Sequence, residues 1–114
     1  LNVVSDQIGS PTYATDLAEA LLKIISNKNK EQSTEIYHYS NEGKISWYDF
    51  AKEIFKLAEI DCKVNPIATE QYPTPAKRPR NTLMSKDKII EEFSLEILGW
   101  KDPLNTCIAT LKEQ

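Results

Sequence analysis

Residues 45–58 read ISWYDFAKEIFKLA, the stretch whose secondary structure is plainest from sequence. Ser46 is a favoured N-cap residue, and Asp49, three positions later, can return the hydrogen bond of a capping box. Apolar side chains then recur at helical spacing and can form one buried stripe: Phe50, Ala51, Ile54, Phe55 and Ala58. We therefore predict an amphipathic helix that begins after Ser46 and ends near Glu59.

The sequence before this helix predicts a strand, a loop and another helix. Residues 1–4 (LNVV) are β-like, and residues 5–12 (SDQIGSPT) predict a loop because Gly, Pro, Ser and Asp gather there. Residues 13–27 predict an amphipathic helix from apolar positions at helical spacing, namely Leu17, Ala18, Ala20, Leu21, Ile24 and Ile25. Residues 27–33 (NKNKEQS) predict a polar linker.

Two further strands are expected. Residues 35–39 (EIYHY) combine β-branched and aromatic side chains and are the best strand candidate, followed by a turn at residues 40–43. Residues 63–67 (KVNPI) predict a second short strand. Pro66 confines that strand to a sheet edge, because proline has no N–H to donate.

The rest of the chain predicts a stiff arm and two helices. Residues 69–79 (TEQYPTPAKRP) contain three prolines, which favour an extended backbone. Ser85 predicts the cap of a short helix over residues 86–92, and Pro103 predicts the start of a last helix, at its first position. Residues 1–114 together predict one small α+β domain, mostly helical with a few short strands.

Composition argues against several classes of function. The net charge of -3, from 14 Lys and Arg against 17 Asp and Glu, provides no basic field for a nucleic acid. No apolar run approaches the roughly 20 residues that cross a membrane. The one histidine, His38, gives little material for a metal site or catalytic triad. Cys62 and Cys107 stand far apart, so we expect two buried thiols in a reducing, cytoplasmic compartment.

Tyr48 and Lys52 have the four-residue spacing with which short-chain dehydrogenases place a proton-donating tyrosine beside a lysine. We interpret the pair as helix structure, because Tyr48 falls in a capped first turn. The three glycines of the chain also form no Gly-x-Gly-x-x-Gly loop for a dinucleotide. We therefore predict no catalytic, cofactor-binding or metal-binding residue in this chain.

Two loops could bind an anion. Residues 77–80 (KRPR) end the proline arm, and an arginine there can hold phosphate through two parallel hydrogen bonds; the alternative is three solvated surface cations. Residues 6–12 (DQIGSPT) place amide and hydroxyl groups ahead of a helix N-terminus, which suits phosphate or sugar hydroxyls; the alternative is a plain loop and helix cap. We expect the tryptophans and tyrosines to be packing residues.

Three segments resemble one family, dTDP-4-dehydrorhamnose reductase, an extended short-chain dehydrogenase/reductase. They are residues 3–22 (VVSDQIGSPTYATDLAEALL), residues 36–55 (IYHYSNEGKISWYDFAKEIF) and residues 66–89 (PIATEQYPTPAKRPRNTLMSKDKI). The first and third segments are specific, because their DQIGSPTY and YPTPAKRPRN motifs are not general features of dehydrogenases.

The resemblance implies a two-part enzyme of rhamnose and cell-envelope polysaccharide synthesis. Such an enzyme reduces the 4-keto group of dTDP-4-dehydro-6-deoxy-L-mannose to give dTDP-L-rhamnose, with hydride from NADPH or sometimes NADH. An N-terminal Rossmann domain carries the cofactor and the catalytic groups, and the family allows a requirement for Mg²⁺. Residues 1–114 would then be the C-terminal substrate-binding lobe, inactive alone. The start of the chain, in a β-like stretch and without Met, also favours an excerpt of a longer protein.

Residue by residue, the resemblance implies this substrate-binding set: Gln7, Pro11, Thr12, Arg78 and Asn81. The first three match a DQxGSPT loop near the active-site cleft, and Arg78, in a PAxRP stretch, is expected to face the substrate diphosphate. Asn81 and Thr82 match an Asn-Ser pair, with Thr where Ser is more usual. Arg80 stands where small residues are usual, and we expect it on the surface rather than on the diphosphate.

Two other functions stay open at this point. One is a regulatory or binding protein on the same scaffold, like the regulatory subunit of methionine adenosyltransferase; the other is a reductase or epimerase for another sugar nucleotide. The expected partners are a dTDP-sugar, the protein's own N-terminal Rossmann domain and, in a homodimer, a second copy. Nucleic acid and membrane are not expected partners.

Overall fold

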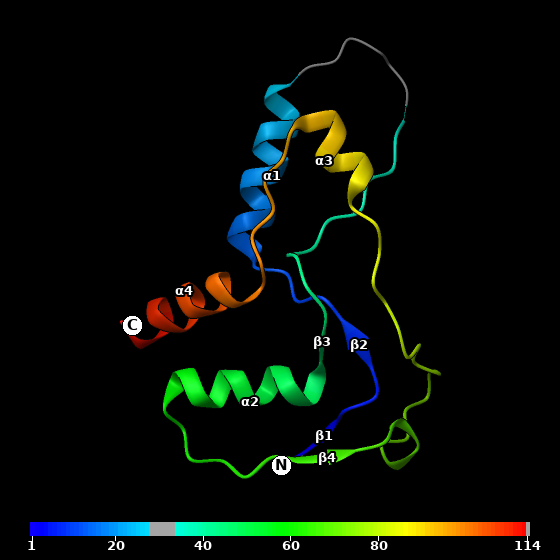
Figure 1. Ribbon diagram of the computed structural model, residues 1–114, viewed down its shortest axis with the longest axis vertical. Coiled ribbons are helices and arrows are strands. Elements are labelled where there is room, and N and C mark those ends of the chain that lie inside the picture. The colour runs from blue at the N-terminus through cyan, green and yellow to red at the C-terminus, as the bar shows by residue number, and fades with distance from the viewer. Residues whose placement is uncertain (28–33, 114) are drawn as a thin grey trace.

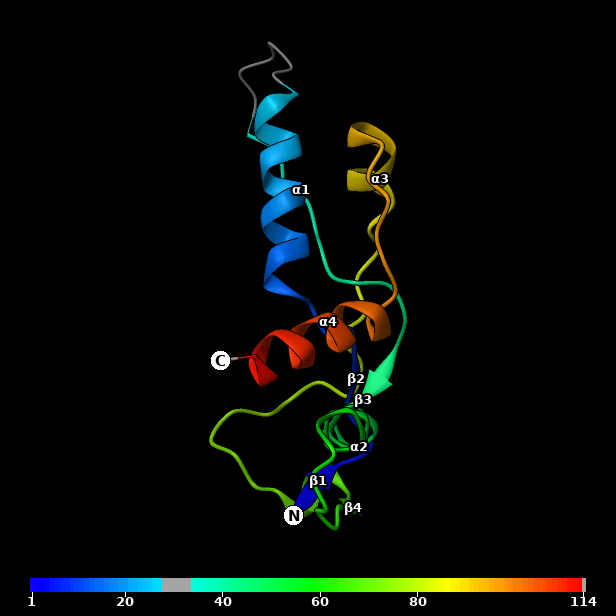
Figure 2. The same ribbon diagram turned by 90° about the vertical axis from the view of Figure 1, so that its left-hand side faces the viewer.

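A computed structural model describes residues 1–27 and 34–113 and confirms an α+β fold, mostly helical with short strands (Figure 1). The elements within those residues are β1 (Asn2–Val4), β2 (Ile8–Gly9), α1 (Ala14–Ser26), β3 (Ile45–Ser46), α2 (Trp47–Ala58), β4 (Asn65–Ile67), the 3₁₀-helix η1 (Thr69–Gln71), α3 (Asp87–Phe93) and α4 (Lys101–Lys112). The molecule is elongated, 52 × 37 × 21 Å. In both views α1 and α3 lie at one end, β1, β4 and α2 at the other, and α4 between them (Figures 1 and 2).

The strands predicted over residues 1–4 and 63–67 are confirmed and pair with each other. β1 and β4 run parallel, with Val3 opposite Pro66. Pro66 lies in a two-stranded sheet, where every strand is an edge strand, as its missing N–H requires. β1 and α4 both contact α2, so the capped helix lies between the small sheet and the last helix.

The loop predicted over residues 5–12 contains a short strand that local composition did not reveal. β2 pairs antiparallel with β3, placing Ile8 opposite Ser46. The N–H of Ile8 donates to the carbonyl of Arg80 (2.8 Å), and its carbonyl accepts from the N–H of Thr82 (3.0 Å). These contacts join segments far apart in the chain and hold the end of the proline arm beside the start of α2.

The helix predicted after Ser46 is confirmed, with one difference in its cap. The N–H of Asp49 donates to the Ser46 hydroxyl oxygen (3.0 Å), and that hydroxyl donates to the Asp49 carboxylate (2.7 Å). The return bond therefore joins the two side chains instead of reaching the Ser46 N–H. The helix ends before Glu59, whose φ of 58° is left-handed. The predicted stripe is half-buried rather than buried; within it, Phe50 meets Trp100 edge-on at 5.9 Å.

The strand predicted over residues 35–39 is wrong. These residues follow an extended trace, and the backbone of residues 36–39 has no backbone hydrogen-bond partner in the described part of the chain. The Tyr37 ring instead meets Phe93 edge-on at 5.2 Å, and its hydroxyl donates to Glu92 (2.6 Å). Strand-forming residues become a strand only beside a second strand, and residues 1–27 and 34–113 place none there.

The helix predicted over residues 13–27 is confirmed as α1, and residues 28–33 of the predicted linker lie outside the described residues. The N-cap of α3 is Lys86, without a side-chain cap bond, so the cap predicted at Ser85 is wrong by one residue. The Ser85 hydroxyl oxygen still accepts the N–H of Asp87 (3.2 Å), the first residue of the helix. The helix begins at Asp87, one residue later than expected, and ends at Phe93.

The last helix begins earlier than predicted. α4 starts at Lys101, so Pro103 occupies its third position rather than its first. Trp100 already has helical backbone angles, and its carbonyl accepts the N–H of Leu104 (3.1 Å), which extends the helix backward. Proline remains compatible with this place, because N–H groups in the first turn have no acceptor within the helix.

A small core joins the elements. Its buried apolar side chains are Val4, Ala20, Ile89, Phe93, Trp100 and Leu104. Asn41, with 0% of its surface exposed, is the polar centre of the fold: its Oδ1 accepts the N–H of Tyr13 (2.7 Å), and its Nδ2 donates to the Asp16 carboxylate (2.5 Å) and the Leu98 carbonyl (3.3 Å). Asn41 therefore fixes the first turn of α1 against the segment that leads into α4.

Candidate functional site

A cleft of about 460 Å³ lies between β1, the start of α2 and the proline arm. Its walls come from separate segments: Asn2, Val3, Val4, Gln7, Trp47, Tyr72, Thr74 and Arg78. The valines and the two aromatic rings give an apolar surface, while an amide, a hydroxyl and a guanidinium supply directed polar contacts. Ligand sites combine these two kinds of wall, and this one suits a molecule with a ring and an anionic group.

Gln7 and Arg78, two of the predicted site residues, meet at this cleft. Gln7 Nε2 donates to Thr69 Oγ1 (3.3 Å), which turns the side chain toward the base of the arm. Arg78 is exposed, and its guanidinium has no hydrogen bond or ion pair within the described residues. A guanidinium without a carboxylate partner, beside a cleft, can donate two parallel hydrogen bonds to a phosphate.

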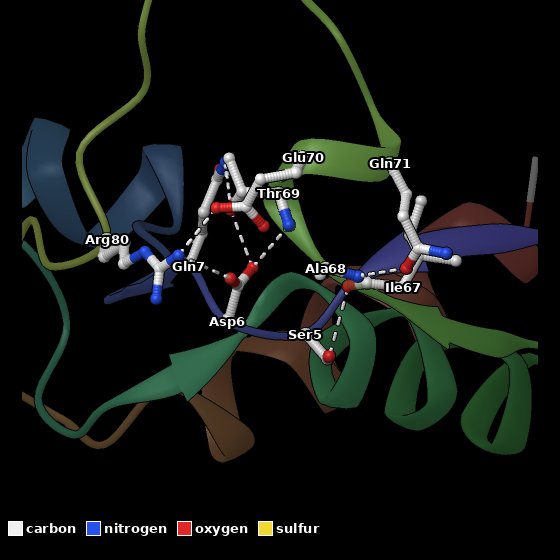
Figure 3. A network of polar contacts seen from close by, with 9 residues as sticks. All are labelled: Ser5, Asp6, Gln7, Ile67, Ala68, Thr69, Glu70, Gln71 and Arg80. Atoms are coloured by element: carbon white, nitrogen blue, oxygen red, sulfur yellow. Dashed lines mark hydrogen bonds and ion pairs between the residues drawn. The ribbon is translucent and has the colours of Figure 1, made fainter.

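A polar network holds the base of the arm in place (Figure 3). The Asp6 carboxylate accepts from the Thr69 N–H (3.0 Å) and the Thr69 hydroxyl (2.7 Å). The bond from this hydroxyl is the main reason that the pKa of Asp6 lies below its ordinary value. The ionised Asp6 thus ties η1 to the loop after β1, one residue before Gln7.

Arg80 completes the same network from the far end of the arm (Figure 3). Its guanidinium donates to the Glu70 carboxylate (2.7 Å) and lies 3.8 Å from the Asp6 carboxylate. Arg80 lies on the surface, as expected, with 66% of its side chain exposed. Two carboxylates compensate its charge, so Arg80 braces the arm that carries Arg78.

The other predicted site residues lie apart from the cleft. Pro11 lines an adjoining hollow of about 100 Å³, and Trp47 forms a wall of both spaces. Asn81 uses its side-chain oxygen in a local turn, accepting the N–H of Leu83 (3.0 Å). Thr12 is exposed and lines neither space. Of the predicted set, Gln7 and Arg78 therefore line the cleft, and Pro11, Thr12 and Asn81 do not.

Tyr48 and Lys52 also lie outside the cleft. Lys52 Nζ sits over the Tyr48 ring, 5.1 Å from its centroid. The ammonium contacts the face of the ring, a cation–π contact between neighbours on a helix surface. This geometry agrees with the interpretation of the pair as helix structure.

The described residues do not fit a dinucleotide or a metal ion. Gly9 is the glycine of the loop between β1 and α1, and a Cβ there would lie 2.8 Å from Thr82 Oγ1, so a side chain rather than a pyrophosphate occupies the space. Residues 1–27 and 34–113 contain no group of three His, Cys, Asp or Glu side chains placed to hold a metal. Cys62 and Cys107 are free and half-buried, not buried as expected. No helix in that part of the chain could span a membrane.

Comparison with known proteins shows the family of the chain. The family described as RmlD substrate binding domain matches residues 1–113. The chain belongs to this family. The domain is 40% identical over 112 residues to a dTDP-4-dehydrorhamnose reductase of Aggregatibacter actinomycetemcomitans, covering 91% of this chain and 38% of that protein. It is also 40% identical over 104 residues to the spore coat polysaccharide biosynthesis protein SpsK of Bacillus subtilis, covering 91% of this chain and 35% of that protein.

Solved structures show the same fold. A dTDP-4-dehydrorhamnose reductase from Clostridium acetobutylicum superposes with a TM-score of 0.88 and 42% identity, covering 98% of this domain and 39% of that chain. The Bacillus anthracis reductase, solved in complex with NADP, gives 0.84 and 34%, covering 96% of this domain and 37% of that chain. The RmlD substrate-binding domain thus spans about 35–39% of these relatives.

Trp47 and Tyr72 are cleft residues of the domain that the sequence did not indicate. The spacing of Trp47 places it three residues before Phe50 on the packing stripe, yet 60% of its surface is exposed. The first turn of α2 reaches past the core and over the cleft, which explains the difference. Tyr72 is 59% exposed and follows η1 at the start of the arm. The expectation of a packing role does hold for Trp100, which is 9% exposed.

Proposed function

We propose that this RmlD substrate-binding domain is the part of a dTDP-4-dehydrorhamnose reductase that holds the sugar nucleotide. The whole enzyme would reduce the 4-keto group of dTDP-4-dehydro-6-deoxy-L-mannose to give dTDP-L-rhamnose, in the cytoplasm, for cell-envelope polysaccharide. Family membership and the reductases at 40% and 36% identity support this activity. Because the domain spans little more than a third of those proteins, an N-terminal Rossmann domain would supply the chemistry.

The main support for the proposal is that the Arg78 guanidinium has no partner among the described residues. It stands at a cleft large enough for a ring and a phosphate group. Arg80, two positions away, is bound by Glu70 and Asp6. A diphosphate would supply the missing partner, because its oxygens accept the paired bonds that a guanidinium donates.

The rest of the cleft suits the uncharged parts of a nucleotide sugar. Trp47 and Tyr72 offer exposed ring faces, on which a base can stack. Gln7 offers an amide and Thr74 a hydroxyl, which can bond to ribose or hexose hydroxyls. The domain would therefore bind and orient the substrate, and its aromatic rings would exclude water from one side.

NADPH, or NADH, and any Mg²⁺ belong in this proposal to the rest of the enzyme. The described residues hold neither a glycine-rich loop for the dinucleotide nor a cluster of metal ligands. We therefore assign no hydride or proton transfer to any residue of this domain.

The proposal is tested by titrating the intact protein with dTDP in a calorimeter. Arg78→Ala should weaken binding by about 1.5–3 kcal/mol, the range of a hydrogen bond to a charged group, or roughly 10- to 150-fold in Kd. Lys77→Ala is the matched control, because it removes a neighbouring exposed charge that does not line the cleft. The control should bind within about twofold of the parent.

Equal affinity of Arg78→Ala and Lys77→Ala would remove Arg78 from the site. A separate assay of the intact protein with dTDP-4-keto sugar and NADPH tests the activity itself. Tight dTDP binding without NADPH oxidation would instead favour a regulatory protein on this scaffold, and preference for another nucleoside diphosphate sugar would favour a related reductase or epimerase.

A further inference from the structure

The proline arm, residues 69–79, is hydrogen-bonded to the rest of the domain only near its two ends. Residues 71–80 are all exposed. Within the described part of the chain, residues 73–79 form no hydrogen bond or ion pair with another segment, and the bond from the Thr74 hydroxyl to the Ala76 carbonyl (2.6 Å) stays inside the arm. The position of the arm therefore depends on how its ends are held, because an exposed loop with few contacts opens easily.

The first end of the arm is held at Thr69 and the last at Arg80, the residue that follows it. Asp6 accepts from the N–H and the hydroxyl of Thr69 (3.0 and 2.7 Å), and the N–H of Ile8 donates to the carbonyl of Arg80 (2.8 Å). The Arg80 guanidinium also donates to the Glu70 carboxylate (2.7 Å), so one ion pair joins the two ends directly (Figure 3). The arm between these two side chains is therefore a closed loop.

This closed loop carries part of the cleft wall, namely Tyr72, Thr74 and Arg78. Arg78 lies two residues before Arg80, so the anchor at the end of the arm also limits where the Arg78 guanidinium can reach. An arm that moves freely must be ordered when a ligand binds, and the cost of ordering lowers the affinity. An ion pair that favours the closed loop in the free protein removes part of this cost before binding.

We propose that Glu70 and Arg80 are positioning residues, whose ion pair holds Arg78 at the cleft for the diphosphate of the ligand. Neither of the two lines the cleft, so they act through Arg78 and not by contact with the ligand. The inference rests on the proposed function for the identity of the ligand, a nucleoside diphosphate. It gives Glu70 a favourable role in binding an anion, although the charge of a carboxylate alone opposes an anion.

Titration of the intact protein with dTDP separates this role from a simple effect of charge. Glu70→Ala removes a negative charge, which by itself would strengthen the binding of an anion. Loss of the ion pair should instead weaken binding, by about three- to fivefold, the upper range for an exposed pair. Arg80→Ala should weaken it at least as much. Glu59→Ala is the matched control, because Glu59 forms an exposed ion pair with Lys112 (3.1 Å) outside the arm, and its affinity should equal that of the parent.

A double-mutant cycle shows whether the ion pair acts through Arg78. Glu70→Ala should cause no further loss of dTDP affinity in a protein that already carries Arg78→Ala, because no guanidinium is left to position. In the reductase assay, Glu70→Ala should raise the KM for the sugar nucleotide and leave the KM for NADPH and the free energy of unfolding in urea unchanged. Additive losses would overturn the proposal, and so would equal changes in both KM values with a loss of stability.

The positioning role and the proposed function can fail separately. Unchanged dTDP affinity in Arg78→Ala would show that the site itself is wrong, and the role of the ion pair would fail with it. Weaker binding in Arg78→Ala, together with equal or tighter binding in Glu70→Ala, would leave the site in place and overturn only the positioning role of Glu70 and Arg80.

Discussion

Replacing Asn41 by alanine should destabilise the domain more than any surface substitution. Asn41 is fully buried, and its amide joins the start of α1 to the segment that leads into α4. The substitution leaves the Tyr13 N–H and the Leu98 carbonyl without their partner, and it removes a short bond to the charged Asp16. Each neutral group costs about 1 kcal/mol, and the bond to a carboxylate costs about 1.5–2 kcal/mol. We therefore expect a loss of about 3.5–4 kcal/mol.

This loss is large against the roughly 5–15 kcal/mol that holds a domain of this kind together. Urea denaturation followed by tryptophan fluorescence measures it, with the slope of the transition checked for two-state behaviour. Asn105→Ala is the matched control, because Asn105 is exposed on α4. A loss below about 1 kcal/mol for Asn41→Ala, or an equal loss in both variants, would refute the assignment of Asn41 as the polar centre of the fold.

Two pH dependences follow from named contacts. The Thr69 hydroxyl holds the pKa of Asp6 in the folded protein below its ordinary value of 3.8. The contribution of Asp6 to stability is therefore complete above pH 3.8 and is lost as the pH falls through the pKa of the folded protein. Asp6→Asn should make the free energy of unfolding in urea less sensitive to acid below pH 3.8. The Glu92 carboxylate, which accepts the hydroxyl of Tyr37, raises the pKa of that tyrosine to about 12. Its contribution is complete below the ordinary value of 10 and is lost as pH rises toward 12, and Glu92→Gln should shift the tyrosine absorbance titration back toward 10.

Local signals predicted the elements that local contacts stabilise. Ser46 and Asp49 are three residues apart and cap α2 by themselves, and helical spacing sufficed for α1. Residues whose structure depends on distant segments were placed less well. β2 exists because Ile8 meets β3 on one side and the end of the arm on the other, and no composition rule within residues 5–12 encodes that pairing. Residues 35–39 show the converse, since strand composition without a partner strand gives no strand.

The candidate site was also predicted only in part from local sequence, as its two arginines, Arg78 and Arg80, show. The motif that contains Arg78 and Arg80 indicated an anion site. The two arginines have the same side chain and lie two residues apart, so the motif alone does not show which of them binds the anion. Their roles separate only when the arm folds back and brings Asp6 and Glu70 to one of them. A carboxylate pair lowers the attraction of Arg80 for an anionic ligand, whereas Arg78 keeps its full charge at the cleft. Removing the Glu70 carboxylate would leave Arg80 beside Asp6 and outside the cleft wall, so Arg80 should not substitute for Arg78.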